Sequence, residues 1–294
     1  MKNKTNIKQF IGIKRNKIYF PNHTINDSLI FNKTIKCIKE LGIECKVYDE
    51  SESDALTDCK NDVIITMARG EKAVNKLIKL QEEGAFILNT GKAIFNCYRV
   101  NMVDLLQNAR VNFPFSKKVK TSDTNLNYSL SSFKSRKIWV KRGDVHAIHR
   151  EDVSPVYSDE ELLNLLKEFS NRGIEYAILQ EHLDGDVIKF YSVKDASFFY
   201  WYYLNGINHT KFELDKLKEY ADVSAEKLEL TIYGGDAIVS AEGEISIIDI
   251  NDWPSFAPIR DEASKIIANT IYKKAINYSN LITHEGKTYV NYSR

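Results

Sequence analysis

Short apolar strands alternate with helical segments through the first third of this chain, and this rhythm constrains the fold more than any other feature. The strands are expected at residues 10–13, 44–48, 62–67 and 85–88, and the helices between them at 27–41 and 71–83. A βαβ order of this kind predicts a small parallel sheet with helices on its faces. Ligands of such sheets bind beyond the carboxyl ends of the strands.

Polar residues follow two of these strands and are candidate substrate contacts. Asn22, His23, Asn26 and Asp27 lie in one loop, and Arg69 lies in another. Asp27 is also the expected cap of the first helix. Asn and Asp are common turn and cap residues, so a purely structural role is the simpler alternative for that loop.

Composition limits the classes of partner. The 294 residues are 43% hydrophobic, enough to bury the cores of two or three lobes. Because 41 Lys and Arg nearly balance 40 Asp and Glu, no overall charge favours nucleic acid or an anionic membrane, and we expect neither as a partner. The chain has no apolar run of roughly twenty residues and no apolar signal core at its start, which predicts a cytoplasmic protein. The four cysteines lack Cys-x-x-Cys spacing and are expected to be reduced packing residues.

The rest of the chain mixes helices with antiparallel strands. Residues 116–135 are polar and are interpreted as a connection with one helix at most. The expected elements after it are strands 137–141 and 176–180 around a helix at 158–170, an antiparallel pair at 187–193 and 198–204, and helices at 225–232 and 261–278. The whole therefore predicts a mixed α/β and α+β fold.

A hairpin near the end gathers oxygen ligands. Alternation over residues 246–250 predicts a strand on which Asp249 and Asn251 share a face. Gly243 lies between two strand-like runs, so the turn there can bring Asp236 beside that pair. Two carboxylates and an amide oxygen suit Mg2+, which is usually shared with substrate phosphates. The alternative is that Asp249 and Asn251 simply face solvent on an edge strand.

The order of three motifs resembles the ATP-grasp enzymes over nearly the whole chain. The motifs are Ile138-Trp139-Val140-Lys141, Gln180-Glu181-His182-Leu183, and Asp236 with Asp249-x-Asn251. The resemblance implies an ATP-grasp fold, with an N-terminal parallel-sheet substrate lobe at 1–115 and two α+β subdomains that clamp the nucleotide. The small subdomain at 116–185 would carry a phosphate flap, and the C-terminal subdomain at 186–294 the metal site. The implied cofactors are ATP and two Mg2+ ions.

The resemblance also suggests roles for individual residues. The nucleotide contacts would be Lys141, Arg142, Gln180, Glu181, His182, Leu183 and Asp186, and the metal ligands Asp236, Asp249 and Asn251. The residues expected to act on the phosphates are Lys189, Arg99 and His146, and the substrate contacts would be Asn22, His23, Arg69 and Ser255. For a single lysine such as Lys189, a surface position is the structural alternative. Lys141 follows an apolar run, so it would be drawn inward and would need an anion.

Two positions depart from the family pattern. Many members cover the phosphates with a glycine-rich flap, whereas residues 141–150 contain one glycine, so Arg142, His146, His149 and Arg150 would have to donate instead. The His146-x-x-His149 spacing could bind zinc, but no third ligand lies nearby in sequence. Gly234 stands where peptide ligases of the family often carry an arginine.

Two reaction classes fit the resemblance. The first is an ATP-dependent ligase that joins a carboxylate of a small molecule or peptide to an amine or a thiol through an acyl phosphate. The second is a kinase for a hydroxyl of a polyol or inositol phosphate, because Asp249-Ile250-Asn251 precedes an aromatic residue and Pro254, and His146 lies five residues after Lys141, as in the inositol polyphosphate kinase branch. The expected substrate loops hold mainly Arg69 beside Asn and Asp, which favours the ligase.

Two further alternatives concern binding rather than reaction class. A nucleotide-binding regulator without turnover is the non-enzyme alternative, and the intact metal triad argues against it. The aromatic run 198–203 is expected in the sheet core, and a homodimer surface is the alternative.

Overall fold

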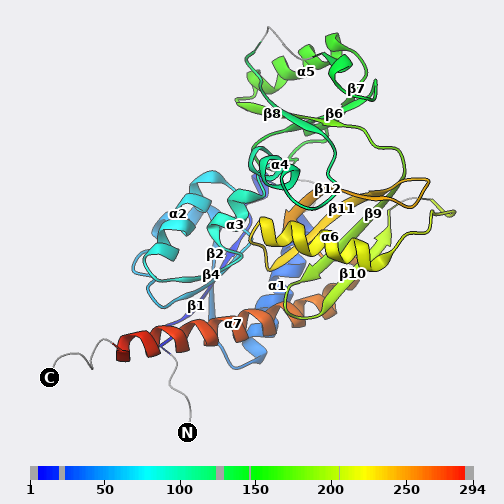
Figure 1. The fold of residues 1–294 in the computed structure, drawn as a ribbon. Coiled ribbons are helices and arrows are strands. Elements are labelled where there is room, and N and C mark those ends of the chain that lie inside the picture. Colours follow the sequence, from blue (N-terminus) through cyan, green and yellow to red (C-terminus); the bar gives the residue numbers. More distant parts are fainter. Residues whose placement is uncertain (1–5, 20–23, 124–128, 146, 205, 289–294) are drawn as a thin grey trace.

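The computed structural model describes residues 6–19, 24–123, 129–145, 147–204 and 206–288, which form three four-stranded sheets (Figure 1). The strand orders are β2-β1-β3-β4, β5-β8-β6-β7 and β10-β9-β11-β12. The small middle sheet, with its helix α5, stands apart from the other two sheets at the top of the view in Figure 1. The mixed α/β and α+β prediction is confirmed.

The N-terminal sheet is parallel throughout, as the βαβ rhythm predicts. Its elements are β1 (Phe10–Lys14), α1 (Thr24–Glu40), β2 (Cys45–Asp49), β3 (Val63–Thr66), α2 (Glu71–Glu82) and β4 (Phe86–Leu88). One detail is wrong, because α1 begins three residues before Asp27. That carboxylate accepts a hydrogen bond from Arg15 instead of capping the helix.

Two short helices, α3 (Gly91–Asn96) and α4 (Arg99–Gln107), lead into the small sheet. Its elements are β5 (Ser116–Lys120), β6 (Ile138–Arg142), β7 (Val153–Val156), α5 (Asp159–Asn171) and β8 (Tyr176–Glu181). The expected connection at 116–135 is wrong at its start, since β5 pairs with β8 as an edge strand. Lys117 and Lys118 place their ammonium groups over aromatic rings, so a lysine-rich segment still packs on a sheet.

The C-terminal sheet is antiparallel and carries helices on both faces. Its elements are β9 (Asp186–Val193), β10 (Phe198–Tyr203), α6 (Leu214–Lys227), β11 (Ile232–Val239), β12 (Ile245–Asp252) and α7 (Arg260–Thr288). The helix expected at 225–232 is wrong. Helix α6 ends at Lys227, Glu229 has a positive φ of 61°, and buried Ile232 already pairs with β9.

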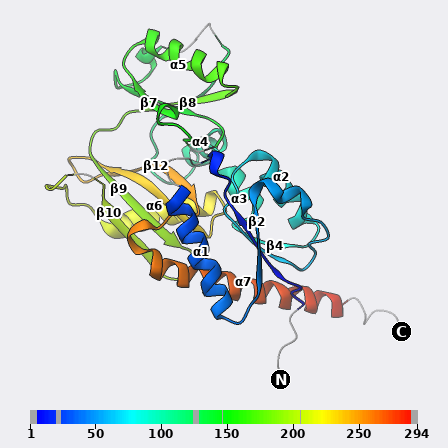
Figure 2. The same ribbon diagram turned by 180° about the vertical axis from the view of Figure 1, so that it is seen from behind.

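Two apolar cores fix this sheet in place. Helix α6 packs on one face (Figure 1), over Phe190 and Ile247. Helices α1 and α7 pack together behind the other face (Figure 2), where Phe31, Trp253 and Ile267 belong to one buried cluster. Because α1 belongs to the N-terminal lobe, this second core joins the parallel sheet to the antiparallel one.

Short 3-10 turns complete the described chain: Lys17–Tyr19, Glu50–Ala55, Leu130–Ser132, Arg150–Asp152 and Ala257–Ile259. The four cysteines are free thiols, and all but Cys37 are buried. No helix in the described ranges combines the length and apolar character needed to cross a membrane.

Candidate active site

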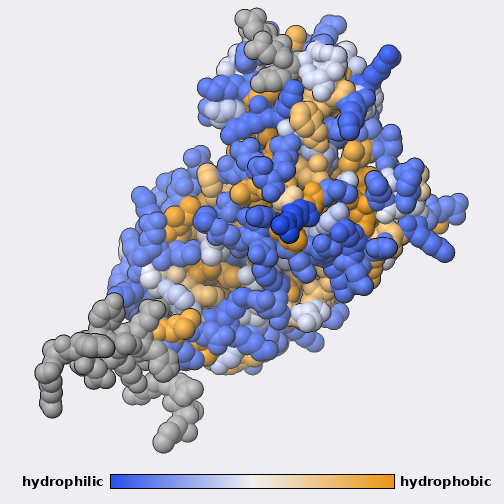
Figure 3. All heavy atoms as spheres, in the orientation of Figure 1, coloured by the Kyte–Doolittle hydropathy of each residue, from blue (hydrophilic) through white to orange (hydrophobic). Residues whose placement is uncertain are grey.

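A cavity of about 410 Å3 opens between the small sheet and the C-terminal sheet. Its size is in the range of small-molecule and cofactor sites. The lining residues are Trp139, Lys141, Val153, Gln180, Glu181, His182, Leu183, Asp184, Gly185, Val187, Lys189, Leu204, Asp236, Ile238, Ile248 and Asp249. Figure 3 shows apolar surface where the small sheet meets the body of the molecule. The structure therefore brings the three sequence motifs to one place.

The segment after β8 forms one wall of this cavity. The indole of Trp139 donates to Nδ1 of His182 at 3.1 Å, and Gln180 donates to Ser116 Oγ at 3.2 Å. The backbone N–H groups of His182 and Leu183 make no backbone hydrogen bond to another described residue. Free backbone groups beside an apolar wall match the donor and acceptor edge of an adenine ring.

Strand β6 directs one basic side chain into the cavity and the next one away from it. Trp139 and Lys141 line the cavity, as alternation along a strand requires. Lys141 is 6% exposed, and its ammonium donates to the carbonyl of Ile248 at 3.1 Å. Burial lowers the pKa of Lys141 to about 8, although Asp249 raises it in part. An anion in the cavity would restore the charged form.

The hairpin of β11 and β12 places the expected metal ligands together. Asp236 pairs in register with Asp249, and Asn251 pairs with Gly234. The register shifts at the next residue pair, so Ile248 is an extra residue that forms a bulge. Gly234 cannot be replaced without movement, because an added Cβ would lie 2.7 Å from the carbonyl oxygen of Phe190. An arginine is therefore excluded from this position by packing.

Basic side chains neutralise the two carboxylates. Lys189 Nζ lies 2.6 Å from Asp236 Oδ1, and Arg99 Nη2 lies 3.0 Å from Asp249 Oδ2. Burial opposes the charge of Lys189, but Asp236 more than offsets this and raises the pKa of Lys189. Arg99 is 5% exposed, and its Nε and Nη1 atoms have no hydrogen-bond partner among the described residues. Buried donors without acceptors are costly, so they mark a place for an anion.

The donor set of this hairpin fits Mg2+ shared with phosphates. Among the described residues no three His, Cys, Asp or Glu side chains form a closed cage. Asp236, Asp249 and Asn251 instead offer an open set of oxygens, which is how Mg2+ is usually bound together with substrate phosphates. Three cations around two carboxylates also leave room for the negative charge of a polyphosphate.

Several expected contacts lie elsewhere. Arg142 lies outside the cavity lining, and its guanidinium donates to both carboxylate oxygens of Asp144, at 2.6 and 2.8 Å, so the structure does not bring it to the expected phosphate site. Asp186 accepts from the backbone of Thr210, beyond the cavity lining. Ser255 is partly buried in the loop after β12. The predictions for Asn22, His23 and His146 fall outside the described residues.

A buried carboxylate organises the segment that was expected to form the flap. Asp152 is inaccessible to solvent and accepts from the backbone of Ile148 at 2.7 Å and of His149 at 3.0 Å. Arg142 and Arg172 pair with the same side chain. Burial alone would raise the pKa of Asp152, but these hydrogen bonds lower it to about 2. The sequence contained the acid, but nothing in its spacing indicated this role.

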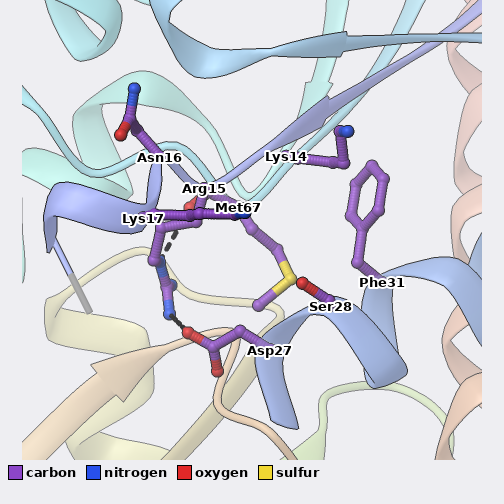
Figure 4. Close-up of a pocket in the computed structure, with 8 residues that line it drawn as sticks. All are labelled: Lys14, Arg15, Asn16, Lys17, Asp27, Ser28, Phe31 and Met67. Carbon is purple, nitrogen blue, oxygen red and sulfur yellow. Dashed lines mark hydrogen bonds and ion pairs between the residues drawn. The ribbon is translucent and has the colours of Figure 1, made fainter. Parts of the chain in front are cut away.

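A second cluster of charges was missed, at the carboxyl edge of the parallel sheet (Figure 4). Arg15 donates from Nη1 to Asp27 at 2.6 Å and from Nε to the carbonyl of Met67 at 3.0 Å. Arg69, expected to touch substrate, is 2% exposed and pairs with Asp252 at 3.2 Å. The cavity beside Arg15 measures about 20 Å3, room for little more than one water.

No family model matches the sequence, and no curated protein matches it. Solved structures do resemble it. The D-alanine–D-alanine ligase from Coxiella burnetii has a TM-score of 0.72 at 11% identity, and the comparison covers 96% of this chain and 99% of that one. The corresponding ligase from Bacillus anthracis, complexed with ATP, has a TM-score of 0.66 at 14% identity, covering 96% and 100%.

A third solved structure is the ATP-grasp ligase PsnB, complexed with a minimal precursor, Mg and ADP. It has a TM-score of 0.60 at 13% identity, and the comparison covers 92% of this chain and 99% of that one. At such low identity these likenesses establish the fold. The chain has the ATP-grasp fold, and the fold expected from the motif order is confirmed.

Proposed function

We propose that this protein is an ATP- and Mg2+-dependent ligase that activates a carboxylate as an acyl phosphate and joins it to an amine. The observation that carries the proposal is the set of cations, Lys141, Lys189 and Arg99, around the carboxylates of Asp236 and Asp249. The ligase structures that share this fold, one of them complexed with ATP and another with Mg and ADP, support it.

The cavity divides into an apolar end and a charged end. The wall after β8 and the ring of Trp139 suit the adenine, and Lys141 lies where the chain of phosphates would begin. Lys189 and Arg99 would then contact the distal phosphates. Mg2+ held by Asp236, Asp249 and Asn251 would neutralise phosphate charge and help to orient the terminal phosphoryl group. Phosphoryl transfer depends mainly on such positioning and charge neutralisation.

The reaction balances in two steps. A substrate carboxylate oxygen forms a bond to the terminal phosphorus of ATP, the bond from that phosphorus to the bridging oxygen breaks, and ADP leaves. The amine nitrogen then attacks the acyl carbon, the bond from that carbon to the phosphate oxygen breaks, and inorganic phosphate leaves with the amine proton passed to solvent. The N–H donors of Arg99 that have no partner in the described part of the chain would offset charge on the transferred group.

Charge at the expected substrate edge favours this reaction over phosphorylation of a polyphosphorylated sugar. A kinase for such a substrate needs unpaired basic groups. Here Arg15 pairs with Asp27, Arg69 pairs with Asp252, and Glu50 accepts from the backbone of Arg69. Buried guanidinium groups already matched by carboxylates attract an added polyanion poorly.

The deciding experiment measures both products of ATP cleavage. The protein is incubated with Mg2+, ATP labelled at the terminal phosphate, and pooled carboxylates, amines, thiols and polyols. Equal release of ADP and free phosphate, dependent on a carboxylate together with an amine, is the expected result. ADP without free phosphate, with the label on a polyol, would overturn the ligase and favour the kinase.

A further inference from the structure

Arg69 lies between Arg99 and the metal-binding strand β12, which the proposed function places around the phosphates. Arg69 itself does not line the cavity. Its guanidinium donates to Asp252 at 3.2 Å, and Asp252 directly follows the metal-ligand candidate Asn251 on β12. Its backbone carbonyl accepts from the hydroxyl of Tyr98 at 2.6 Å, and Tyr98 directly precedes Arg99 at the start of α4. Arg69 therefore contacts the residue next to Asn251 and the residue next to Arg99.

The contacts of Arg69 are rigid because they are buried. Arg69 and Asp252 are each 2% exposed, and Tyr98 is 7% exposed. Glu50 fixes the loop from behind, since its carboxylate accepts from the backbone N–H groups of Arg69 and Gly70. Buried ionic hydrogen bonds hold geometry well, because breaking one strands a charge away from water.

These contacts close a ring of interactions. Arg99 pairs with Asp249 at 3.0 Å, Asp249 lies three residues before Asp252 on the same strand, and Arg69 links Asp252 back to Tyr98. Moving Arg69 would change the position of Arg99 relative to β12. Groups that act on phosphates must be placed to within a fraction of an ångström. Residues that contact the metal ligands from outside the site usually provide this placement.

We propose that Arg69, through Asp252 and Tyr98, is a positioning residue that aligns Arg99 with the metal-binding strand, rather than a substrate contact. The inference rests on the proposed function, because it concerns the same nucleotide and Mg2+ site. It predicts that disturbing Arg69 weakens the response of nucleotide binding to Mg2+ and leaves metal-free nucleotide binding intact.

The test uses ADP affinity with and without Mg2+, measured by calorimetry on the full chain, so it needs no acceptor substrate. In Asp252→Asn and Arg69→Lys, the ratio of the metal-free to the Mg2+-containing dissociation constant should fall by about tenfold, as for residues behind metal ligands. The metal-free constant should change by less than about twofold, since the adenine wall is untouched. The double variant should be no worse than either single variant, because both disturb one pair.

Asn89 offers a matched control. It is also 2% exposed at the carboxyl edge of the parallel sheet, and it joins the C-terminal sheet through hydrogen bonds of 2.7 to 3.0 Å with Thr231 and Ile232. Asn89→Ala should loosen the contact between the lobes yet leave the Mg2+ response unchanged. A response that falls equally in Asn89→Ala, or that survives in Arg69→Lys and Asp252→Asn, would overturn the inference.

Two arrangements keep the result decisive. If Arg69→Lys and Asp252→Asn both fail to fold, Tyr98→Phe takes their place, because it removes a single hydroxyl. It should lower the ratio of the metal-free to the Mg2+-containing dissociation constant by about threefold, and an unchanged ratio overturns the inference. If ADP binding by the unaltered protein does not respond to Mg2+, the proposed function itself fails and the inference falls with it. If ADP binding by the unaltered protein responds to Mg2+ and the variants keep the same response, the inference about Arg69 fails but the proposed function does not.

Discussion

Two clusters of arginine and carboxylate side chains differ in what surrounds them. At the edge of the parallel sheet, the side chains of Arg15, Arg69, Asp27 and Asp252 are at most 8% exposed, and each guanidinium has a carboxylate partner. In the cleft, the side chains of Lys189, Asp236 and Asp249 are also paired, but they are 27%, 22% and 15% exposed. Charge alone does not mark a ligand site, whereas charge that solvent and ligands can reach does.

Strand β12 contributes one aspartate to each cluster. Asp249 and Asp252 are three residues apart on β12, so they face opposite sides of the sheet. Asp249 lines the cavity, and Asp252 lies in the buried contact between the lobes. The same chemical group should therefore contribute mainly to turnover at one position and mainly to stability at the other.

The largest expected effect is on turnover in Asp249→Asn. The substitution keeps the shape of the side chain and removes a charge that would help to hold Mg2+, so turnover should fall on the order of a thousandfold. The ADP and phosphate assay described above measures it. Asp195→Asn, in the turn after β9 where Asp195 pairs with Lys274, is the matched control and should change nothing. A folded Asp249→Asn protein with turnover within a few fold of the parent would remove this hairpin from the active site.

The second effect is on stability. Asp252→Asn should lower the free energy of unfolding more than Asp249→Asn does, the reverse of their expected order for turnover. Asp252→Asn leaves Arg69 buried with a weakened partner, and we expect the free energy of unfolding to drop by about 3 kcal/mol. Asp249→Asn should cost about 1 kcal/mol, because this side chain is more exposed and its amide oxygen can still accept from Arg99. Urea denaturation of both variants measures the difference. Equal losses would show that burial does not separate the two clusters.

A third effect concerns pH and the flap. The pKa of Asp152 is lowered from 3.8 to about 2, so the folded state favours its charged form. Its stabilising contribution should be complete above about pH 4 and lost as the pH falls toward 2, a change of about 2 kcal/mol. Unfolding free energies of the unaltered protein and of Asp152→Asn, measured across this interval, should converge at the acid end. A constant difference between the two proteins would show that the charge of Asp152 does not stabilise the folded state.

The sequence was sufficient where pattern and geometry coincide. Alternation placed Asp249 and Asn251 on one face, and the turn at Gly243, with a positive φ of 85°, put Asp236 in register with Asp249. The sequence was insufficient where a side chain is matched by distant partners. Arg69 and Asp252 are 183 positions apart, and no local spacing predicts that such residues meet.

Arg142 shows how a correctly predicted strand can still leave the direction of a side chain unpredicted. The sequence placed a strand at 137–141 and assigned Arg142 to a phosphate flap at 141–150. In the structure β6 continues through Arg142, and alternation turns that side chain away from the cavity toward Asp144 and Asp152. A one-residue extension of a strand reverses the face of the next side chain.

The smallest effect, and the most specific to the cleft, is proton uptake when nucleotide binds. Burial lowers the pKa of Lys141 to about 8, so at pH 8 roughly half of the free protein carries a neutral amine there. A phosphate beside it favours the ammonium, and binding of ADP should take up about 0.5 proton at pH 8 and far less at pH 7. Calorimetry in buffers of different ionisation enthalpy measures the uptake. Lys141→Arg is the control that removes this titration and leaves that of the ADP phosphates. If the arginine variant takes up as many protons as the parent at pH 8, Lys141 does not meet the phosphates. The cleft would then lack the ligand-binding charge that is proposed to distinguish it from the buried cluster at the sheet edge.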